Sequence, residues 1–382
     1  MNGTRRLIIA VYVDDLLILS SDNKLLLSSD NKLLETTKQR LQQKLKIKDL
    51  GVATEILGIR IARDFKKGTL QLDQSSYIEK ILNKFNMNGC KPVTTPADPN
   101  AKLDGNKQPK EDVETEEIKN VPYQEAIGSL LFLCHYFYVK QKAGKKTLDR
   151  GKKNFPLFEP ERRHWTAVKR IFRYLRGTTN LKLEFRKDKE QFLEAYSDAD
   201  WANELDDRRS ITGNVIKFQH DADWANELDD RRSITGNVIK FQHGAISWSS
   251  KKQKTVALST TEAEYMGLST TCQEVLWLRM LAQEIDATAV SQPTIVYCDN
   301  KSAIDLAETS AYRQRTKHID VRHHFLREKI EDGEISINHI PTDEMTADSL
   351  TKPLFKQKHE TCAKNMGLVT SINICSRGSV KN

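Results

Sequence analysis

The order of apolar segments after Phe192 limits the fold more than any other feature. Short apolar runs alternate there with amphipathic helical segments, in the order strand, hairpin, long helix, strand, helix, strand, helix. Strands that alternate with helices are typical of an α/β layer. We therefore predict an α/β domain with a mixed sheet over residues 192–355.

Two of the predicted strands are followed at once by an acid. FLEAYSDADWA brings Asp198 to the end of its apolar run, and PTIVYCDNKSAI brings Asp299 to the same place before a turn into a helix. Ligands of open α/β sheets bind at the carboxyl ends of the strands. Both acids are therefore predicted to belong to a site.

Two further acids lie at predicted helix starts. In LSTTEAEYMGL, Ser259 to Glu262 fit a capping box, which gives Glu262 a structural task and leaves Glu264 without a local explanation. Asp348 begins the helical part of TADSLTKPL, where a favourable charge at a helix N-terminus is the alternative interpretation.

Together these four acids predict a metal site. Carboxylates that converge repel one another unless cations neutralise them, and oxygen ligands without a Cys or His cluster favour Mg²⁺ or Mn²⁺ over zinc. Two such ions would activate a water and stabilise the leaving oxygen in phosphodiester hydrolysis. His339, nine residues before Asp348, is a candidate proton shuttle.

A perfect repeat interrupts this region. DADWANELDDRRSITGNVIKFQH occupies residues 198–220 and again 221–243, so Asp198 and Asp221 are both candidates for the first acid. Asp198 follows the apolar FLEAYS, as a central strand requires, whereas Asp221 is nearer to the strand GAISWSS. We predict that Asp198 is used, that the second GNVIKFQ pairs with GAISWSS, and that the chain between them forms a surface loop.

The N-terminal part is a separate α/β segment over residues 1–90. VYVDDLLILS predicts a hairpin with Asp14 and Asp15 at its tip, either a metal site or an Asp-rich turn. The helical LLETTKQRLQQKL, the strands EILGIRIAR and TLQLDQ, and the helical SSYIEKILNKF follow. Residues 91–122, rich in Pro, Asp, Lys and Glu, predict a linker.

The remaining segments flank the C-terminal domain. Residues 123–191 are interpreted as a degraded connection region, and residues 356–382 as a tail. Within the connection, RRHWTAVKRIFRYLRGT predicts an amphipathic helix whose basic face is either simply solvated or contacts a nucleic-acid backbone.

The amino-acid composition indicates which classes of partner the chain can bind. The net charge of +8 and the pI near 9.0 favour a polyanion such as nucleic acid. The six cysteines form no CxxC pair and predict reduced thiols, and no apolar run is long enough to span a membrane. We expect an intracellular protein, cytoplasmic or nuclear, whose oligomeric state stays open.

The chain resembles the Pol polyprotein of copia-type LTR retrotransposons, from the end of the reverse transcriptase to the end of the ribonuclease H. The resemblance is carried in order by YVDD, LGIRIARDFKKGTLQLDQSSYIEKILNKFNM, SDADWA, ISWSSKKQKTVALSTTEAEYMGL, YCDNKSAIDLA, RTKHIDVRHHFLRE and TADSLTKPL. It implies a truncated polymerase palm in residues 1–90 and a ribonuclease H-like domain in residues 192–355.

By this resemblance, Asp198, Glu264, Asp299 and Asp348 match the four acids that bind two metal ions in a ribonuclease H, whose substrate is an RNA/DNA hybrid. Asp14 and Asp15 match part of a polymerase metal site that needs a third aspartate on an earlier strand. Only thirteen residues precede Asp14, so we expect no polymerase activity. The alternative function is a catalytically inactive nucleic-acid-binding relic of a transposon pseudogene.

Overall fold

The computed structural model describes residues 7–20, 32–99, 121–137, 162–187, 193–200, 233–286, 290–308 and 320–370. Its contacts divide the chain into two compact units, Met1–Ala62 and Arg63–Asn382, which are treated separately below. The finer division into palm, linker, connection, ribonuclease H-like domain and tail stays a prediction. None of the described helices is long and apolar enough to cross a membrane.

The first unit begins with the predicted hairpin. Strands β1 (Leu7–Tyr12) and β2 (Asp15–Ser20) pair antiparallel, with Tyr12 opposite Asp15 and a two-residue turn between them. Helix α1 (Lys32–Lys44) follows where a helix is predicted. The hairpin exposes Val11 and Val13 together with both acids of the turn region.

The predicted strand EILGIRIAR is wrong in one respect, because it contains a turn. It forms β3 (Glu55–Ile56) and β4 (Ile59–Asp64), in which Ile56 pairs with Ile59. The two residues between them, Leu57 and Gly58, have φ of +54° and +74°. Two successive positive φ values produce a tight hairpin turn whose twist matches that of the flanking strands. Glycine adopts this conformation readily but leucine rarely does, so residue 57 offers no sequence signal for the turn.

The second unit opens with a strand and a three-helix core. Its first elements are β5 (Thr69–Asp73), α2 (Ser75–Lys84), α4 (Tyr123–Phe137), α5 (Arg162–Thr178) and β6 (Leu181–Arg186). The helices bury Leu82, Leu130 and Phe172 in one apolar cluster, as their amphipathic patterns require.

The basic face of α5 is partly engaged within the protein. Arg173 Nε donates to the carbonyl of Lys91 at 2.8 Å, and Arg176 Nε donates to that of Asn88 at 2.9 Å. Arg170 donates to the Thr95 hydroxyl at 2.9 Å. These arginines hold the segment after α2 against the helix.

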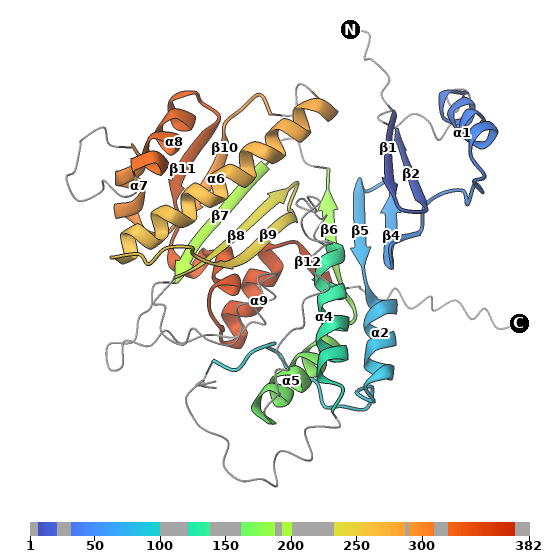
Figure 1. Cartoon of the computed structure of the whole chain (residues 1–382), viewed down its shortest axis with the longest axis horizontal. Coiled ribbons are helices and arrows are strands. Elements are labelled where there is room, and N and C mark those ends of the chain that lie inside the picture. Colours follow the sequence, from blue (N-terminus) through green and yellow to red (C-terminus); the bar gives the residue numbers. More distant parts are fainter. Residues whose placement is uncertain are drawn as a thin grey trace, which may run out of the picture. The chain divides into compact units, whose positions relative to one another are not determined.

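The C-terminal half forms the predicted mixed sheet, and the α/β fold class is confirmed. The strand order is β11-β10-β7-β8-β9 (Figure 1): β11, β10 and β7 pair parallel, and β7, β8 and β9 pair antiparallel. Their bounds are β7 (Leu193–Asp200), β8 (Ile234–Phe241), β9 (Gly244–Lys252), β10 (Thr294–Cys298) and β11 (Ile335–His339).

The sheet uses both copies of the repeat. β7 takes its last three residues from the first copy, and β8 comes from the second and pairs with β9, as predicted. The intervening residues 201–232, including the alternative acid Asp221, lie outside the described residues.

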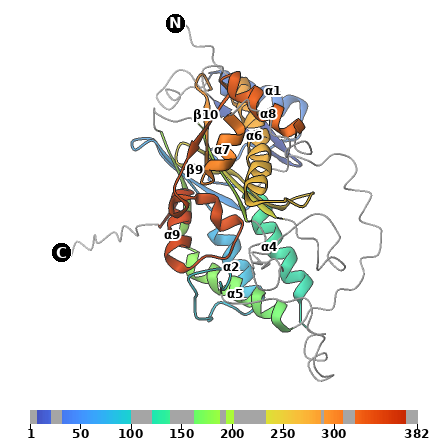
Figure 2. The same ribbon diagram turned by 90° about the vertical axis from the view of Figure 1, so that its left-hand side faces the viewer.

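Three helices pack beside one another on this sheet: α6 (Thr260–Ile285), α7 (Lys301–Glu308) and α8 (Asp320–Glu331) (Figures 1 and 2). Successive strand residues point to opposite faces, and β7 shows this clearly. Leu193 and Ala195 join the large core with Leu268 of α6, whereas Tyr196 joins a second cluster with Met345.

The last elements that the structure describes are short and approach the second face of the sheet. They are the 3₁₀ helices η4 (Thr342–Glu344) and η5 (Thr346–Leu350), then α9 (Lys356–Asn365) and β12 (Leu368–Thr370). β12 pairs with β6, which pairs with β5, so residues after 356 also contribute regular structure.

The prediction that Asp348 begins an α-helix is wrong, because Asp348 lies inside η5. The amides of Thr351 and Lys352 both donate to the carbonyl of Asp348, which closes the turn. Pro353 follows, and a proline cannot donate the next helical hydrogen bond. The α-helix therefore starts only at Lys356.

Candidate metal centre

The four predicted acids come from four elements of the second unit. Asp198 lies near the end of β7, Glu264 in the second turn of α6, Asp299 directly after β10, and Asp348 within η5. The elements converge because β7 and β10 are parallel neighbours whose carboxyl ends lie at one edge of the sheet.

The start of α6 is fixed by its predicted cap. The Ser259 hydroxyl accepts from the amide of Glu262 at 3.1 Å, and Glu262 Oε2 accepts from the amide of Leu258 at 2.8 Å. The Glu262 carboxylate accepts from the residue before the N-cap Ser259 and not from Ser259 itself, and its role is structural, as predicted. With the helix start held in this way, Glu264 is directed toward the sheet.

Asp198 is almost completely buried, with 3% of its surface exposed. Its Oδ2 accepts a short hydrogen bond from the hydroxyl of Thr351. Burial raises the pKa of Asp198 to about 7; Asp348 and Asp299 add to this, and Lys352 opposes it. The carboxyl therefore lies in an environment that disfavours its negative charge.

Glu264 is in a similar position, with 6% of its surface exposed. Its Oε1 accepts from the amide of Ala199 at 3.2 Å. Burial raises the pKa of Glu264 to about 9, and the charges of Asp198 and Asp299 act in the same direction. Because Asp299 acts on both buried carboxyls and Asp198 acts on Glu264, these three acids share one region of the protein.

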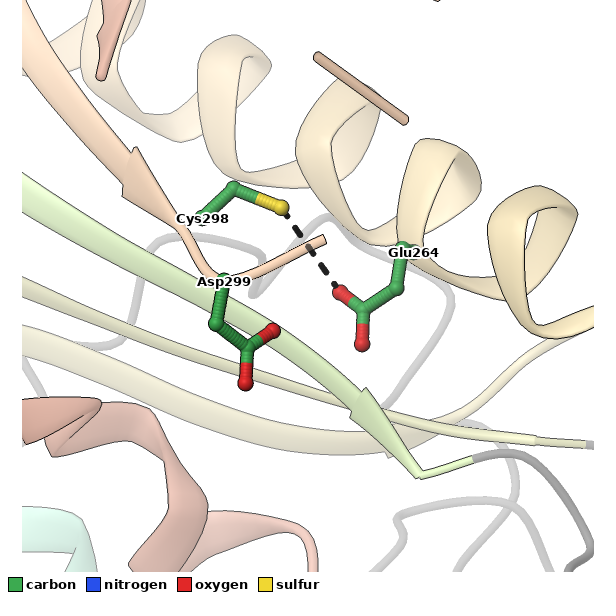
Figure 3. Close-up of side chains that lie close together, drawn as sticks. All are labelled: Glu264, Cys298 and Asp299. Carbon is green, nitrogen blue, oxygen red and sulfur yellow. Dashed lines mark hydrogen bonds between the residues drawn. The ribbon is translucent and has the colours of Figure 1, made fainter. Parts of the chain in front are cut away.

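Glu264, Cys298 and Asp299 form the tightest group. Each offers one potential ligand atom, and these atoms lie within 4.8 Å of one another. Figure 3 shows Cys298 of β10 facing Glu264 of α6, with Sγ 4.0 Å from Oε2, and Asp299 beside them. Asp299 is half-buried, and its Oδ2 accepts from the Thr342 hydroxyl at 2.8 Å.

Asp348 differs from the other three acids because lysines contact it. Lys352 Nζ lies 2.8 Å from Oδ1, and Lys358 Nζ lies 3.3 Å from Oδ2. Burial lowers the pKa of Lys352, but the carboxylates of Asp198 and Asp348 outweigh it and raise that pKa above its usual range.

The other predicted residues are not part of this group. His339 ends β11 opposite Cys298 and is exposed. Asp14 and Asp15 belong to the first unit, and within the described ranges they join no cluster of three potential ligands. Cys90, Cys272, Cys298 and Cys362 are free thiols.

Comparison with known proteins places the chain in a family. A family described as reverse transcriptase (RNA-dependent DNA polymerase) matches residues 1–99. The chain is 38% identical over 95% of its length to the retrovirus-related Pol polyprotein of transposon TNT 1-94 of Nicotiana tabacum. It is 33% identical over 96% of its length to that of transposon RE1 of Arabidopsis thaliana. The chain belongs to the copia-type retrotransposon Pol polyproteins.

This Pol segment spans only part of its relatives, 24% of the tobacco polyprotein and 22% of the Arabidopsis one. Among solved structures it is similar to a ribonuclease H1 isolated from compost, crystallised in complex with an RNA/DNA hybrid. That similarity covers 41% of this chain and 92% of the other, with 15% identity and a TM-score of 0.27.

Several residues of the Pol site were missed from the sequence. Thr351, Lys352 and Lys358 contact the acids directly, and Cys298 lies close to Glu264 and Asp299. A signal existed for Lys352, because a lysine four residues after an acid often pairs with it on a helix. No local pattern predicts Lys358, since α9 brings it back to η5.

The residues present fit a divalent cation. Among the described residues, neither Asp198 nor Glu264 forms an ion pair, although both are buried. Buried carboxylates without a counterion are unfavourable unless they are protonated or bind a metal. Carboxylate oxygens are the ligands of Mg²⁺ and Mn²⁺, and the nearby thiol of Cys298 adds one softer donor.

Proposed function

We propose that this Pol segment is a ribonuclease that hydrolyses the RNA strand of an RNA/DNA hybrid with the help of two divalent metal ions, Mg²⁺ or Mn²⁺. The observation that carries the proposal is the meeting of Asp198, Glu264 and Asp299 at the carboxyl edge of the sheet, where Asp299 raises the pKa of Asp198 and both aspartates raise the pKa of Glu264. Asp348 is assigned to the same site because its charge also raises the pKa of Asp198.

In this proposal each acid has a defined task. Asp198, Glu264 and Asp299 would hold the metal, and Asp348 would contribute from η5. Bound divalent cations supply a nucleophilic water and stabilise the leaving oxygen of a phosphodiester. The amide of Ala199 and the hydroxyl of Thr351 orient the carboxylates of Glu264 and Asp198 before any ligand arrives.

His339 is proposed as the group that transfers a proton to the leaving oxygen. It stands exposed at the end of β11, directly opposite Cys298 and therefore one residue from Asp299 along the neighbouring strand. An exposed imidazole beside a metal site can act as a general acid toward a bound substrate.

The test is cleavage of a labelled RNA/DNA hybrid by the purified chain with Mg²⁺ or Mn²⁺. Asp299→Asn and Glu264→Gln should each reduce the rate by at least about a hundredfold, because each removes a metal ligand. Asp305→Asn is the matched control, since Asp305 is exposed on α7 away from the site, and it should cleave like the parent. Cleavage unaffected by Asp299→Asn would refute the assignment.

The alternative is a non-catalytic protein that only binds nucleic acid. The net charge of +8 favours contact with phosphates whether or not the site is active. Salt-sensitive binding of the hybrid, without cleavage at any metal concentration, would support this alternative and exclude the ribonuclease.

A further inference from the structure

An exposed aromatic side chain lies at the turn that leads into β5. Residues 65–68 form this turn, and Phe65, its first residue, is 55% exposed. The guanidinium carbon of Arg63 lies 5.5 Å from the centre of the Phe65 ring, in a cation–π contact that holds the two side chains together. Arg63 and the whole turn belong to the second unit. The ring is therefore presented to solvent and does not fill the core.

Three exposed lysines stand at the same place. Lys66 and Lys67 are the next two residues of the turn, and Lys187 follows β6 directly. The amide of Lys187 donates to the carbonyl of Gly68 at 2.9 Å, which puts this residue beside the turn. Within the part of the chain that the structure describes, none of the three lysines forms an ion pair, and neither does Arg63. Their charges can therefore interact with an external anion.

Two acids near these lysines take part in contacts within the protein. Asp64 Oδ1 accepts from two amides of the turn, at 2.9 and 3.0 Å. Glu184 Oε1 accepts from Nε of Arg186 at 2.6 Å, and Glu184 Oε2 accepts from Nε2 of Gln71 at 2.6 Å. Among the described residues, the cations at this place therefore outnumber the carboxylates.

The turn is fixed against β6. Gly68 has a φ of +64°, which glycine adopts without strain. Thr69 pairs with Arg186, and Leu70 pairs with Phe185, in the antiparallel ladder that continues from the turn. Because this framework is already ordered, a ligand that binds there does not have to order the turn first.

The combination of cations and an aromatic ring favours one class of ligand. Exposed cations attract the phosphates of any nucleic acid. An exposed ring beside them adds a flat face on which an unpaired base can stack. In a duplex the bases are already stacked within their own strands and paired with the other strand, so the ring has no such partner there.

We propose that Arg63, Phe65, Lys66, Lys67 and Lys187 form a binding surface for single-stranded nucleic acid, named here the Phe65 surface. The lysines hold phosphates, and Phe65, oriented by Arg63, stacks with a base. Binding tolerates different sequences, because every base has a π-face. The Phe65 surface shares no residue with the metal centre, so the inference goes beyond the proposed ribonuclease and does not rest on it.

The first experiment measures the fluorescence anisotropy of a short labelled single-stranded oligonucleotide with the full chain, in the presence of a metal chelator. Phe65→Ala should weaken binding at least about fivefold, because the stacking of one base is lost. Phe65→Trp should restore it. Phe355→Ala is the matched control, because Phe355 is 67% exposed at the start of α9 and has no ring contact within the described ranges, and it should bind like the parent.

The second experiment repeats the titration at increasing salt. Lys66→Gln/Lys67→Gln should make the slope of the logarithm of the binding constant against the logarithm of the salt concentration shallower by about 1.4, because two phosphate contacts to a single strand are lost. Lys80→Gln/Lys364→Gln is the matched control. Both of its lysines are exposed, on α2 and α9, and form no ion pair among the described residues, so the slope should stay that of the parent.

The proposal would be overturned by a parent that does not bind the single strand, or by a Phe65→Ala variant that binds it like the parent. An equal loss of affinity for a blunt duplex in Phe65→Ala would also contradict stacking. Binding of anionic phospholipid vesicles through Phe65, without binding of the oligonucleotide, would assign the Phe65 surface to a membrane instead. Thermal unfolding checks each variant; if Phe65→Ala is not folded, Phe65→Leu keeps an apolar side chain without a ring and replaces it. Since the chelator removes divalent metal, these results are separate from the test of hybrid cleavage.

Discussion

Asp198 and Gly236 lie directly opposite each other on β7 and β8, although they come from different copies of the repeat. A Cβ atom on Gly236 would lie 2.7 Å from Cγ2 of Thr351 and 3.0 Å from the carbonyl oxygen of Ala347. The missing side chain therefore lets η5 close against the sheet. This close approach brings the Thr351 hydroxyl to Asp198 and sets Asp348 beside it.

Gly236→Ala should consequently damage both the fold and the site. The added methyl group forces η5 away from β8, and overpacking of this kind costs about 1–3 kcal/mol. We expect a lower midpoint in urea unfolding and weaker Mn²⁺ binding. Gly128→Ala is the control, because its Cβ would meet no atom within 4 Å and alanine favours a helix such as α4. Equal unfolding midpoints for Gly236→Ala and the parent would contradict the packing argument.

The positions of three acids could be predicted because they depend on local patterns. Asp198 and Asp299 follow apolar runs that end at the edge of the sheet, and runs of this kind are visible in a single sequence. Glu264 was separated from Glu262 by the capping box, which is also a local signal.

The remaining features depend on contacts between distant segments. Lys358 contacts Asp348 only because α9 folds back against η5, and no residue spacing in the sequence predicts this packing. The 3₁₀ geometry around Asp348 reflects Pro353 together with packing on Gly236. The turn at Leu57 was missed because its positive φ contradicts the usual preference of leucine.

The pH dependence of stability follows from the two buried carboxyls. The pKa of Asp198 is raised to about 7 and that of Glu264 to about 9. The folded protein therefore holds protons that the unfolded chain releases above about pH 4. As pH rises from about 4 to about 9, these groups lower the free energy of unfolding, and the effect levels off above that window.

The predicted fall in the free energy of unfolding with rising pH is tested by urea unfolding of the metal-free protein at pH 5, 7 and 9. Glu264→Gln cannot ionise, so it should lose less stability than the parent between pH 5 and pH 9. Saturating Mg²⁺ should reduce the loss in the parent, because the cation stabilises the ionised form and binds only the folded state. A parent that gains stability over this range relative to Glu264→Gln would contradict the raised pKa values.

His339→Ala tests the proposed proton shuttle. His339 is exposed and lies beside the acids without contacting them, so its loss should leave Mn²⁺ binding and thermal stability unchanged. General acid catalysis contributes roughly 10² to 10⁴ in rate, and we expect a loss toward the lower end of that range. A parallel loss of Mn²⁺ affinity would instead indicate a structural task.

The double variant Asp14→Asn/Asp15→Asn tests whether the hairpin of the first unit takes part in metal binding or catalysis. Both acids are exposed at the hairpin of the first unit, and no third potential ligand joins them among the described residues. Two exposed carboxylates repel each other without the burial and the additional ligands that hold a metal tightly. We therefore expect the double variant to bind Mn²⁺ and cleave a hybrid like the parent, and we expect neither protein to extend a primer on an RNA template. Primer extension by the parent that is lost in the double variant would show that the hairpin still supports polymerase chemistry.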